Sequence, residues 1–219
     1  MAVVTTILPI KEILARIYPF LQKQVRSVCK TGILRSMRIL ADRTGLRLLQ
    51  TAYGFHSWHA AAPLSARPYR RVVAHLVNAL EPRCVVEVGC GLGSILSLVN
   101  APELFGYDVD AGAVRAARLI RGRRISFIQG DMTTVAQSHI DVLILCNWIH
   151  EFSPAQLDAW ITPLLSRTSY LLLDAIDSDG PEGYRFKHDF SFLGARASRI
   201  SVSRAPDEGR SFCVYKVAR

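Results

Sequence analysis

Short, almost wholly apolar runs recur along the chain from residue 84 onward, separated by glycines, acids and amphipathic segments. A strand buried on both faces of a sheet has this composition, because neither of its sides meets water. Such runs occupy residues 84–88, 104–107, 125–129, 140–146 and 169–173. Each is followed by a helical or loop segment, and strands that alternate with helices are typical of a parallel sheet covered by helices on both faces.

Two further runs near the end of the chain alternate apolar and polar residues. They span 197–203 and 211–217, and the connection 205–210 contains the proline, aspartate and glycine that favour a turn. We therefore expect an antiparallel pair that completes the sheet. The predicted fold is an α/β, Rossmann-like, doubly wound and mostly parallel seven-stranded sheet with an antiparallel C-terminal strand, preceded by an N-terminal helical extension.

Charge divides the chain near residue 62. Residues 1–62 have a net charge of +7, whereas residues 63–219 have a net charge of only +2. Apolar residues recur at helical spacing over 10–28, and a second helix is predicted over 33–49. We interpret residues 1–62 as a basic helical cap docked on the domain formed by 63–219. Contact with an anionic membrane surface is the first alternative, and contact with nucleic acid is the less favoured one.

Composition and motifs also bear on the cellular compartment of the protein and on whether it binds a metal. The five cysteines include no Cys-x-x-Cys pair, and Cys84, Cys90 and Cys146 fall on or beside predicted core strands, which indicates reduced packing residues in a cytoplasmic protein. The six histidines do not cluster with acids at ligand spacing, so no metal is expected. The longest apolar stretches, such as 142–149, are too short to span a bilayer, and the N-terminus lacks a signal-peptide pattern. The oligomeric state is not indicated.

The segment 85–94 carries the strongest sign of chemistry. A strand that contains Glu87 leads directly into Gly89, Gly91 and Gly93, and apolar residues 95–98 then open a helical pattern. Strand, glycine turn and helix form a context in which nucleotide-type ligands bind, because glycines let the backbone turn tightly and approach the ligand. The spacing G-x-G-x-G differs from the G-x-G-x-x-G of dinucleotide-binding proteins. An NAD-type ligand and a turn without any ligand are the alternatives.

This motif, with its acid two residues before the first glycine, resembles motif I of the class I S-adenosylmethionine (SAM) methyltransferases. The resemblance covers roughly residues 63–219 and implies SAM as the cofactor, held by Glu87 and the three glycines. In that family an acid at the end of the second strand accepts hydrogen bonds from both ribose hydroxyls, and Asp108 matches it. The family also implies that Asp131 binds the adenine amino group, with Met132 against the ring. A plain turn role is the alternative for Asp131.

The segment 147–151 follows the fourth apolar run, and in open α/β sheets the chemistry lies at the carboxyl ends of strands. It lacks the Asn/Asp-Pro-Pro-aromatic motif of amino-methylating members of the family. His150 is therefore the candidate general base, since imidazole titrates near neutral pH; a packing role is the alternative. His188, in the long connection 177–193, is the second candidate. We expect Asn147 beside the cofactor. The candidate substrate residues are Tyr69, Arg67, Trp148 and Arg185, with plain loop roles as the alternative for Tyr69 and Arg67.

These observations predict a SAM-dependent methyltransferase of small molecules that O-methylates a sugar or another natural-product intermediate. An RNA methyltransferase that uses the basic extension to hold phosphates is one alternative, but few aromatic residues accompany the basic ones there. A non-catalytic subunit of the same fold that binds a partner through its N-terminal helices is the other.

Overall fold

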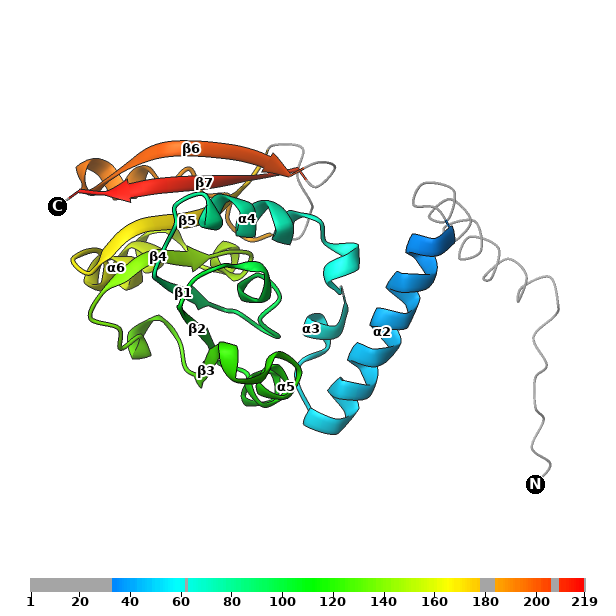
Figure 1. Cartoon of the computed structure of the whole chain (residues 1–219). Helices are drawn as coiled ribbons and strands as arrows, with labels where there is room; N and C mark the ends of the chain where they lie inside the picture. Colours follow the sequence, from blue (N-terminus) through cyan, green and yellow to red (C-terminus); the bar gives the residue numbers. More distant parts are fainter. Residues whose placement is uncertain (1–32, 62, 178–183, 206–208, 219) are drawn as a thin grey trace, which may run out of the picture.

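The computed structural model describes residues 33–61, 63–177, 184–205 and 209–218, and it contains one seven-stranded sheet (Figure 1). The strands lie in the order β3-β2-β1-β4-β5-β7-β6. The first five are parallel, and β7 is antiparallel to β5 and β6. Their bounds are β1 Cys84–Val88, β2 Glu103–Asp108, β3 Ser126–Gln129, β4 Ile140–Leu145, β5 Thr168–Ile176, β6 Ala197–Ala205 and β7 Arg210–Val217. The predicted mostly parallel sheet with an antiparallel C-terminal pair is confirmed.

Helices cover both faces of the sheet, as the alternating pattern predicts. Successive residues of a strand point to opposite faces. Val85 lies in the apolar cluster that includes α4 (Tyr69–Asn78) and α5 (Ala111–Arg121). Its neighbour Val86 lies in a second cluster that includes α6 (Pro154–Leu165). Both valines are fully buried, so β1 is a central strand whose two sides are both core.

The strand order reverses at β1, which pairs with β2 on one side and with β4 on the other. At such a switch point the loops that follow the two adjacent strands leave toward opposite faces and open a crevice beyond the carboxyl ends. The loops after β1 and β4, residues 89–95 and 146–153, are therefore positioned to form a ligand site.

Side-chain caps fix where the two long crossover helices begin. Asp110 precedes α5, and its Oδ1 accepts from the backbone N–H groups of Gly112 at 2.8 Å and Ala113 at 3.0 Å. Ser153 and Gln156 form a reciprocal capping box at the start of α6. Caps of this kind are worth about 1 kcal/mol each. Asp110 is thus the N-cap of α5.

The prediction that a helix begins at residues 95–98 is wrong. Only a single 3-10 turn, η2 (Leu96–Leu98), follows the glycines, and the chain is extended again at Val99. Asn78 stops the helix: its side chain donates to the Leu98 carbonyl at 3.1 Å and accepts from the Asn100 N–H at 2.7 Å. Four apolar residues are also too few to sustain a helix on their own.

Ahead of α4 lie helices α2 (Ile33–Tyr53) and α3 (Ser57–Ala61). The predicted helix over 33–49 is confirmed and runs further, whereas the one predicted over 10–28 lies outside the described residues. A small apolar cluster anchors α2 and α3 to α5, and the His56 N–H donates to Asp110 Oδ2 at 2.7 Å. The cluster comprises Phe55, Ala60, Leu92, Ala113 and Ala116, with Leu46, Leu49 and Tyr53 packed against it.

The outer side of α2 is apolar and exposed: Leu34 is 84% exposed and Leu48 is 68% exposed. Among the described residues, no helix is both long and apolar enough to cross a membrane. Contact of this region with a membrane surface stays a prediction. Cys84, Cys90 and Cys146 are buried free thiols, as expected from their strands.

Candidate functional site

The glycine turn after β1 is built so tightly that side chains have no room in it. Gly89, Gly91 and Gly93 all have positive φ, at 72°, 52° and 65°. A Cβ added at Gly91 would lie 2.7 Å from Nδ1 of His59, and one at Gly93 would lie 2.5 Å from the ring of Phe127. The turn therefore needs glycine both for its backbone conformation and for the rings packed on it.

Asp108, at the end of β2, fastens this turn. Its Oδ2 accepts from the Gly91 N–H at 2.7 Å, and its Oδ1 accepts from the Asp110 N–H at 2.9 Å. The side chain is almost fully buried. Asp108 thus joins the ends of two adjacent parallel strands and places a carboxylate in the crevice between them.

A small cavity of about 240 Å³ opens beside Asp108. Its walls are aromatic and its rim carries two acids, which suits a flat, apolar ring with polar groups on its edge. The lining includes Asp108, Asp131, Met132, Trp58, Trp148 and Trp160.

Asp131 has a structural role as well as a place in this lining. Its Oδ1 accepts from the Thr133 hydroxyl at 2.6 Å and from the Thr133 N–H at 2.9 Å, and these bonds lower the pKa of Asp131. It therefore caps the short turn η4 (Met132–Thr134). The turn role and the ligand role are compatible, because a carboxylate has a second oxygen available as an acceptor.

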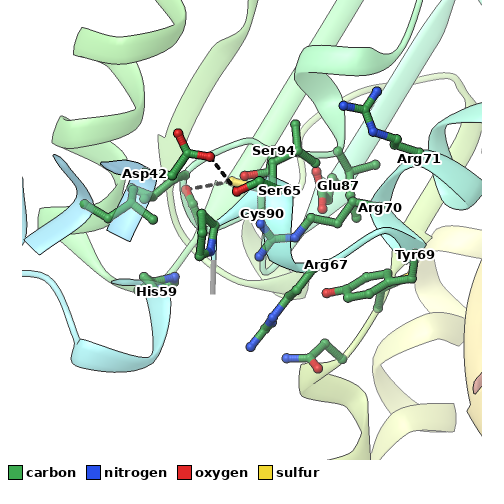
Figure 2. A pocket seen from close by; sticks show the side chains of 18 of the residues that line it. Asp42, His59, Ser65, Arg67, Tyr69, Arg70, Arg71, Glu87, Cys90 and Ser94 are labelled. Carbon is green, nitrogen blue, oxygen red and sulfur yellow. Dashed lines mark hydrogen bonds between the residues drawn. The ribbon is translucent and has the colours of Figure 1, made fainter. Parts of the chain in front are cut away.

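A larger cavity of about 530 Å³ adjoins the small one, and Gly89 and Trp58 line both. It is bounded by α2, by the segment before α4 and by the glycine turn (Figure 2). Asp42 on α2 accepts from the Ser65 hydroxyl at 2.5 Å, a bond that crosses one side of this cavity. Its lining is rich in charge and includes Arg38, Arg67, Arg70, Arg71, Arg121, Asp42, Glu87, Tyr69 and Asn147.

Glu87 is the unusual acid of this cavity. Only 4% of it is exposed, and Oε2 has no hydrogen-bond partner among the described residues. Burial raises the pKa of Glu87 from 4.5 to about 8, and the nearby charge of Arg70 only partly opposes the shift. A buried carboxyl with an unpaired oxygen on a cavity wall suits a ligand ammonium group.

The pKa of Glu87 predicts how the free energy of unfolding varies with pH. The folded protein holds this proton up to about pH 8, while the unfolded chain releases it near pH 4.5, so the stability of the wild type falls between these values. Glu87→Gln removes this dependence. The difference in unfolding free energy between variant and wild type should grow by roughly 1 kcal/mol per pH unit in that window.

Chemical denaturation at pH 5.5 and 8.0 measures this effect. Glu103→Gln, at an exposed acid on β2, is the matched control and should leave the pH dependence unchanged. Parallel stability curves for wild type and Glu87→Gln would contradict the prediction.

The sequence did not single out Trp58 and His59, which lie on α3. The His59 ring covers Gly91, and its Nε2 lies 3.6 Å from Asp110 and 3.9 Å from Asp108. Burial lowers the pKa of His59 although both acids act in the opposite direction. Trp58 stacks on His59 with 3.7 Å between ring centroids. The aromatic and histidine residues of the loop before α4 were a signal, but the sequence did not show which of them reach the turn.

A buried polar network stands at the carboxyl end of β4. Asn147 has a positive φ of 76° with a ψ of −63°, and its N–H donates to Asp174 at 2.8 Å. Arg210 donates to Asp174 at 3.1 Å and to the Asn147 side chain at 2.9 Å, and the Tyr184 hydroxyl donates to the same Asn147 oxygen at 2.9 Å. No local sequence pattern indicated Asp174 and Arg210, which come from β5 and β7 and meet only in the folded sheet.

The His150 ring contacts this network at Asp174, and the His188 ring stacks on that of His150. Neither histidine lines either cavity. The fully buried His150 ring donates from Nδ1 to the Phe186 carbonyl at 3.0 Å, and its Nε2 lies 3.3 Å from Asp174. His188 donates to the Ile149 carbonyl at 3.0 Å, and burial lowers its pKa. The base role of either ring stays a prediction.

The predicted substrate residues separate in the structure. Tyr69 and Arg67 line the large cavity, as expected for residues that meet a ligand there. Trp148 instead lines the small cavity, where its indole donates to the Val88 carbonyl at 2.7 Å. Arg185 is exposed against Phe186 and lines neither cavity.

Comparison with known proteins agrees with this architecture. Residues 85–167 match the family model described as a methyltransferase domain. No curated protein sequence matches the chain. The structure of magnesium protoporphyrin IX methyltransferase from Synechocystis PCC 6803 with bound SAM is 18% identical, with a TM-score of 0.58 over 81% of this chain and 97% of that one. The N-methyltransferase NodS from Bradyrhizobium japonicum WM9 is 14% identical, with a TM-score of 0.58 over 69% of this chain and 96% of that one.

At these identities the two structures show a shared fold, and the family match covers the segment that contains the glycine turn, Asp108, Asp131 and Asn147. The chain therefore contains a segment that matches a methyltransferase domain, residues 85–167, and it shares the fold of SAM-binding methyltransferases of known structure.

Proposed function

We propose that this protein transfers the methyl group of SAM to a hydroxyl group of a small molecule. The observation that carries the proposal is the pair of adjoining cavities that meet at Gly89, beyond the carboxyl ends of β1 and β4. One is narrow and aromatic, and the other is wide and charged. This division suits a cofactor with a nucleoside at one end and an amino acid at the other.

The residues of the small cavity fit the nucleoside. Met132 and Trp148 offer apolar surfaces for adenine, and Asp131 offers a carboxylate at the rim. Each oxygen of Asp108 already accepts one backbone N–H. A carboxylate has about four acceptor sites in all, so Asp108 can also accept both ribose hydroxyls without releasing the glycine turn.

The residues of the large cavity fit the amino-acid end. The unpaired oxygen of Glu87 is placed to accept from an ammonium group, and Arg70 beside it is placed to bind a carboxylate (Figure 2). Asn147 lines the same cavity and is held by the network at the end of β4. Bound SAM supplies a methyl group with a good leaving group, so positioning the acceptor provides much of the catalysis.

A hydroxyl acceptor also needs a general base, and we assign this role to His150, with His188 as the fallback. Nε2 of His150 has no hydrogen-bond partner among the described residues and faces the Asp174 carboxylate. Because His150 lines neither cavity and its Nε2 faces Asp174, this assignment requires that the acceptor's proton reach Nε2 through the polar groups at the end of β4. Asp174 in turn holds Asn147, which lines the cavity.

Calorimetry tests the cofactor assignment. SAM and S-adenosylhomocysteine should bind with measurable heat, whereas NAD should not, because the turn lacks the spacing that receives a pyrophosphate. Binding of NAD in preference to SAM, or no binding of SAM at all, would overturn the proposal.

A further inference from the structure

We propose that the methyl acceptor is a small-molecule anion, carrying a carboxylate or a phosphate group that Arg38 and Arg67 bind between α2 and the segment before α4. This inference rests on the proposed function, because it assigns the chemical class of the acceptor of the same site.

Charge accounting in the large cavity supports it. Five arginines and only two acids line this cavity. Only Asp42 contributes a full negative charge near neutral pH, because burial raises the pKa of Glu87 to about 8. The empty space is therefore surrounded by an excess of positive charge.

Within the part of the chain that the structure describes, no acid forms an ion pair with these arginines. Among the described residues, the ion pairs of arginine with acids involve Arg196, Arg204 and Arg210, none of which lines the large cavity. Arg121 donates to the Leu92 carbonyl at 3.1 Å, so it is committed to the glycine turn. Arginine forks left unpaired on a cavity wall are the groups that proteins use to recognise carboxylates and phosphates.

The cofactor does not remove the imbalance. SAM carries a sulfonium and an ammonium against a single carboxylate, so it adds one net positive charge to the cavity. Its carboxylate can occupy one arginine, and Arg70 is the one beside Glu87 (Figure 2). Of the three arginines that remain, Arg71 points away from Arg67 (Figure 2), so Arg38 and Arg67 are left for the second ligand, and an anion would balance their charge.

Geometry favours a small molecule over a nucleic acid. The arginines line a concave space of about 530 Å³, which lies within the range of small-molecule pockets. Arg38 comes from α2 and Arg67 from the segment before α4, and the bond between Asp42 and Ser65 fastens these two elements together. The anion is thus expected in the space that this contact encloses.

The experiment uses the full chain saturated with S-adenosylhomocysteine, so that the cofactor carboxylate occupies its own site. Inorganic phosphate and benzoate are titrated separately against chloride at constant ionic strength, with calorimetry and thermal shift as readouts. At least one of them should stabilise the wild type. The double variant Arg38→Gln/Arg67→Gln should need at least about a tenfold higher anion concentration for the same thermal shift, since it loses two charge-assisted contacts. Its affinity for S-adenosylhomocysteine should change by no more than about threefold.

Arg123→Gln is the matched control, because Arg123 is exposed and lines neither cavity. Equal anion binding by wild type and double variant would overturn the inference. Displacement of S-adenosylhomocysteine by phosphate would also overturn it, since the arginines would then serve the cofactor. The inference would also be overturned if neither small anion bound, while a short single-stranded RNA bound to the wild type and not to the double variant. If S-adenosylhomocysteine itself fails to bind, the proposed function fails, and titration of the ligand-free protein still tests the two arginines.

Discussion

Asp108→Asn is expected to weaken the binding of SAM by about 30- to 150-fold, or 2–3 kcal/mol. The substitution removes the charge that would accept two ribose hydroxyls. It also replaces one of the two acceptor oxygens by an NH₂ group, which accepts no hydrogen bond. The side chain therefore loses its contact with either the Gly91 N–H or the Asp110 N–H, each of which uses its own oxygen in the wild type. Both effects act on the cofactor site, because these two backbone groups hold the glycine turn against the end of β2.

Calorimetric titration of the folded variant with SAM measures this loss. Asp110→Asn is the matched control: it changes the same charge two residues away, on the side chain that caps α5. That variant should be less stable to denaturant by up to about 1 kcal/mol yet bind SAM within roughly threefold of the wild type. Undiminished affinity of Asp108→Asn would remove Asp108 from the cofactor site.

The features that the sequence predicted well are those encoded by neighbouring residues. The buried strands were evident because a strand that is core on both sides is apolar throughout, as β4 is. The turn at Gly91 depends on a few adjacent residues, and the structure has it. The order of these elements then leaves few topologies, since parallel crossovers follow one hand.

The features that the sequence did not predict arise from contacts between distant segments. Asp174 and Arg210 meet because β5 and β7 pair in the sheet, and no local pattern indicates that register. His59 reaches Gly91 only because α2 and α3 dock on α5. The helix expected after the glycines does not form. The side chain of Asn78 on α4 instead makes hydrogen bonds with the backbone of that segment. Local propensity is commonly overridden in this way by tertiary contacts.

His150→Ala is expected to lower kcat by about 10²–10⁴-fold at saturating SAM, the range of a general base. The structure makes a separate control necessary, because His150 contacts Asp174 and lines neither cavity. Loss of the ring could act on the network that holds Asn147 as well as on proton transfer. His150→Gln separates these two effects, since its amide can still donate to the Phe186 carbonyl but cannot take up a proton.

Initial rates as a function of pH, with SAM affinity measured in parallel, distinguish the roles. A base at His150 requires that both variants lose activity across the pH range tested and that SAM affinity stays unchanged. Recovery of activity in His150→Gln would make the ring a positioning residue for Asp174. Full activity of His150→Ala together with inactivity of His188→Ala would move the base to His188, whose ring centroid lies 5.4 Å from that of His150. Activity in all three variants would show that transfer proceeds by positioning alone, and an amine or an already acidic hydroxyl would then replace the hydroxyl proposed here as acceptor.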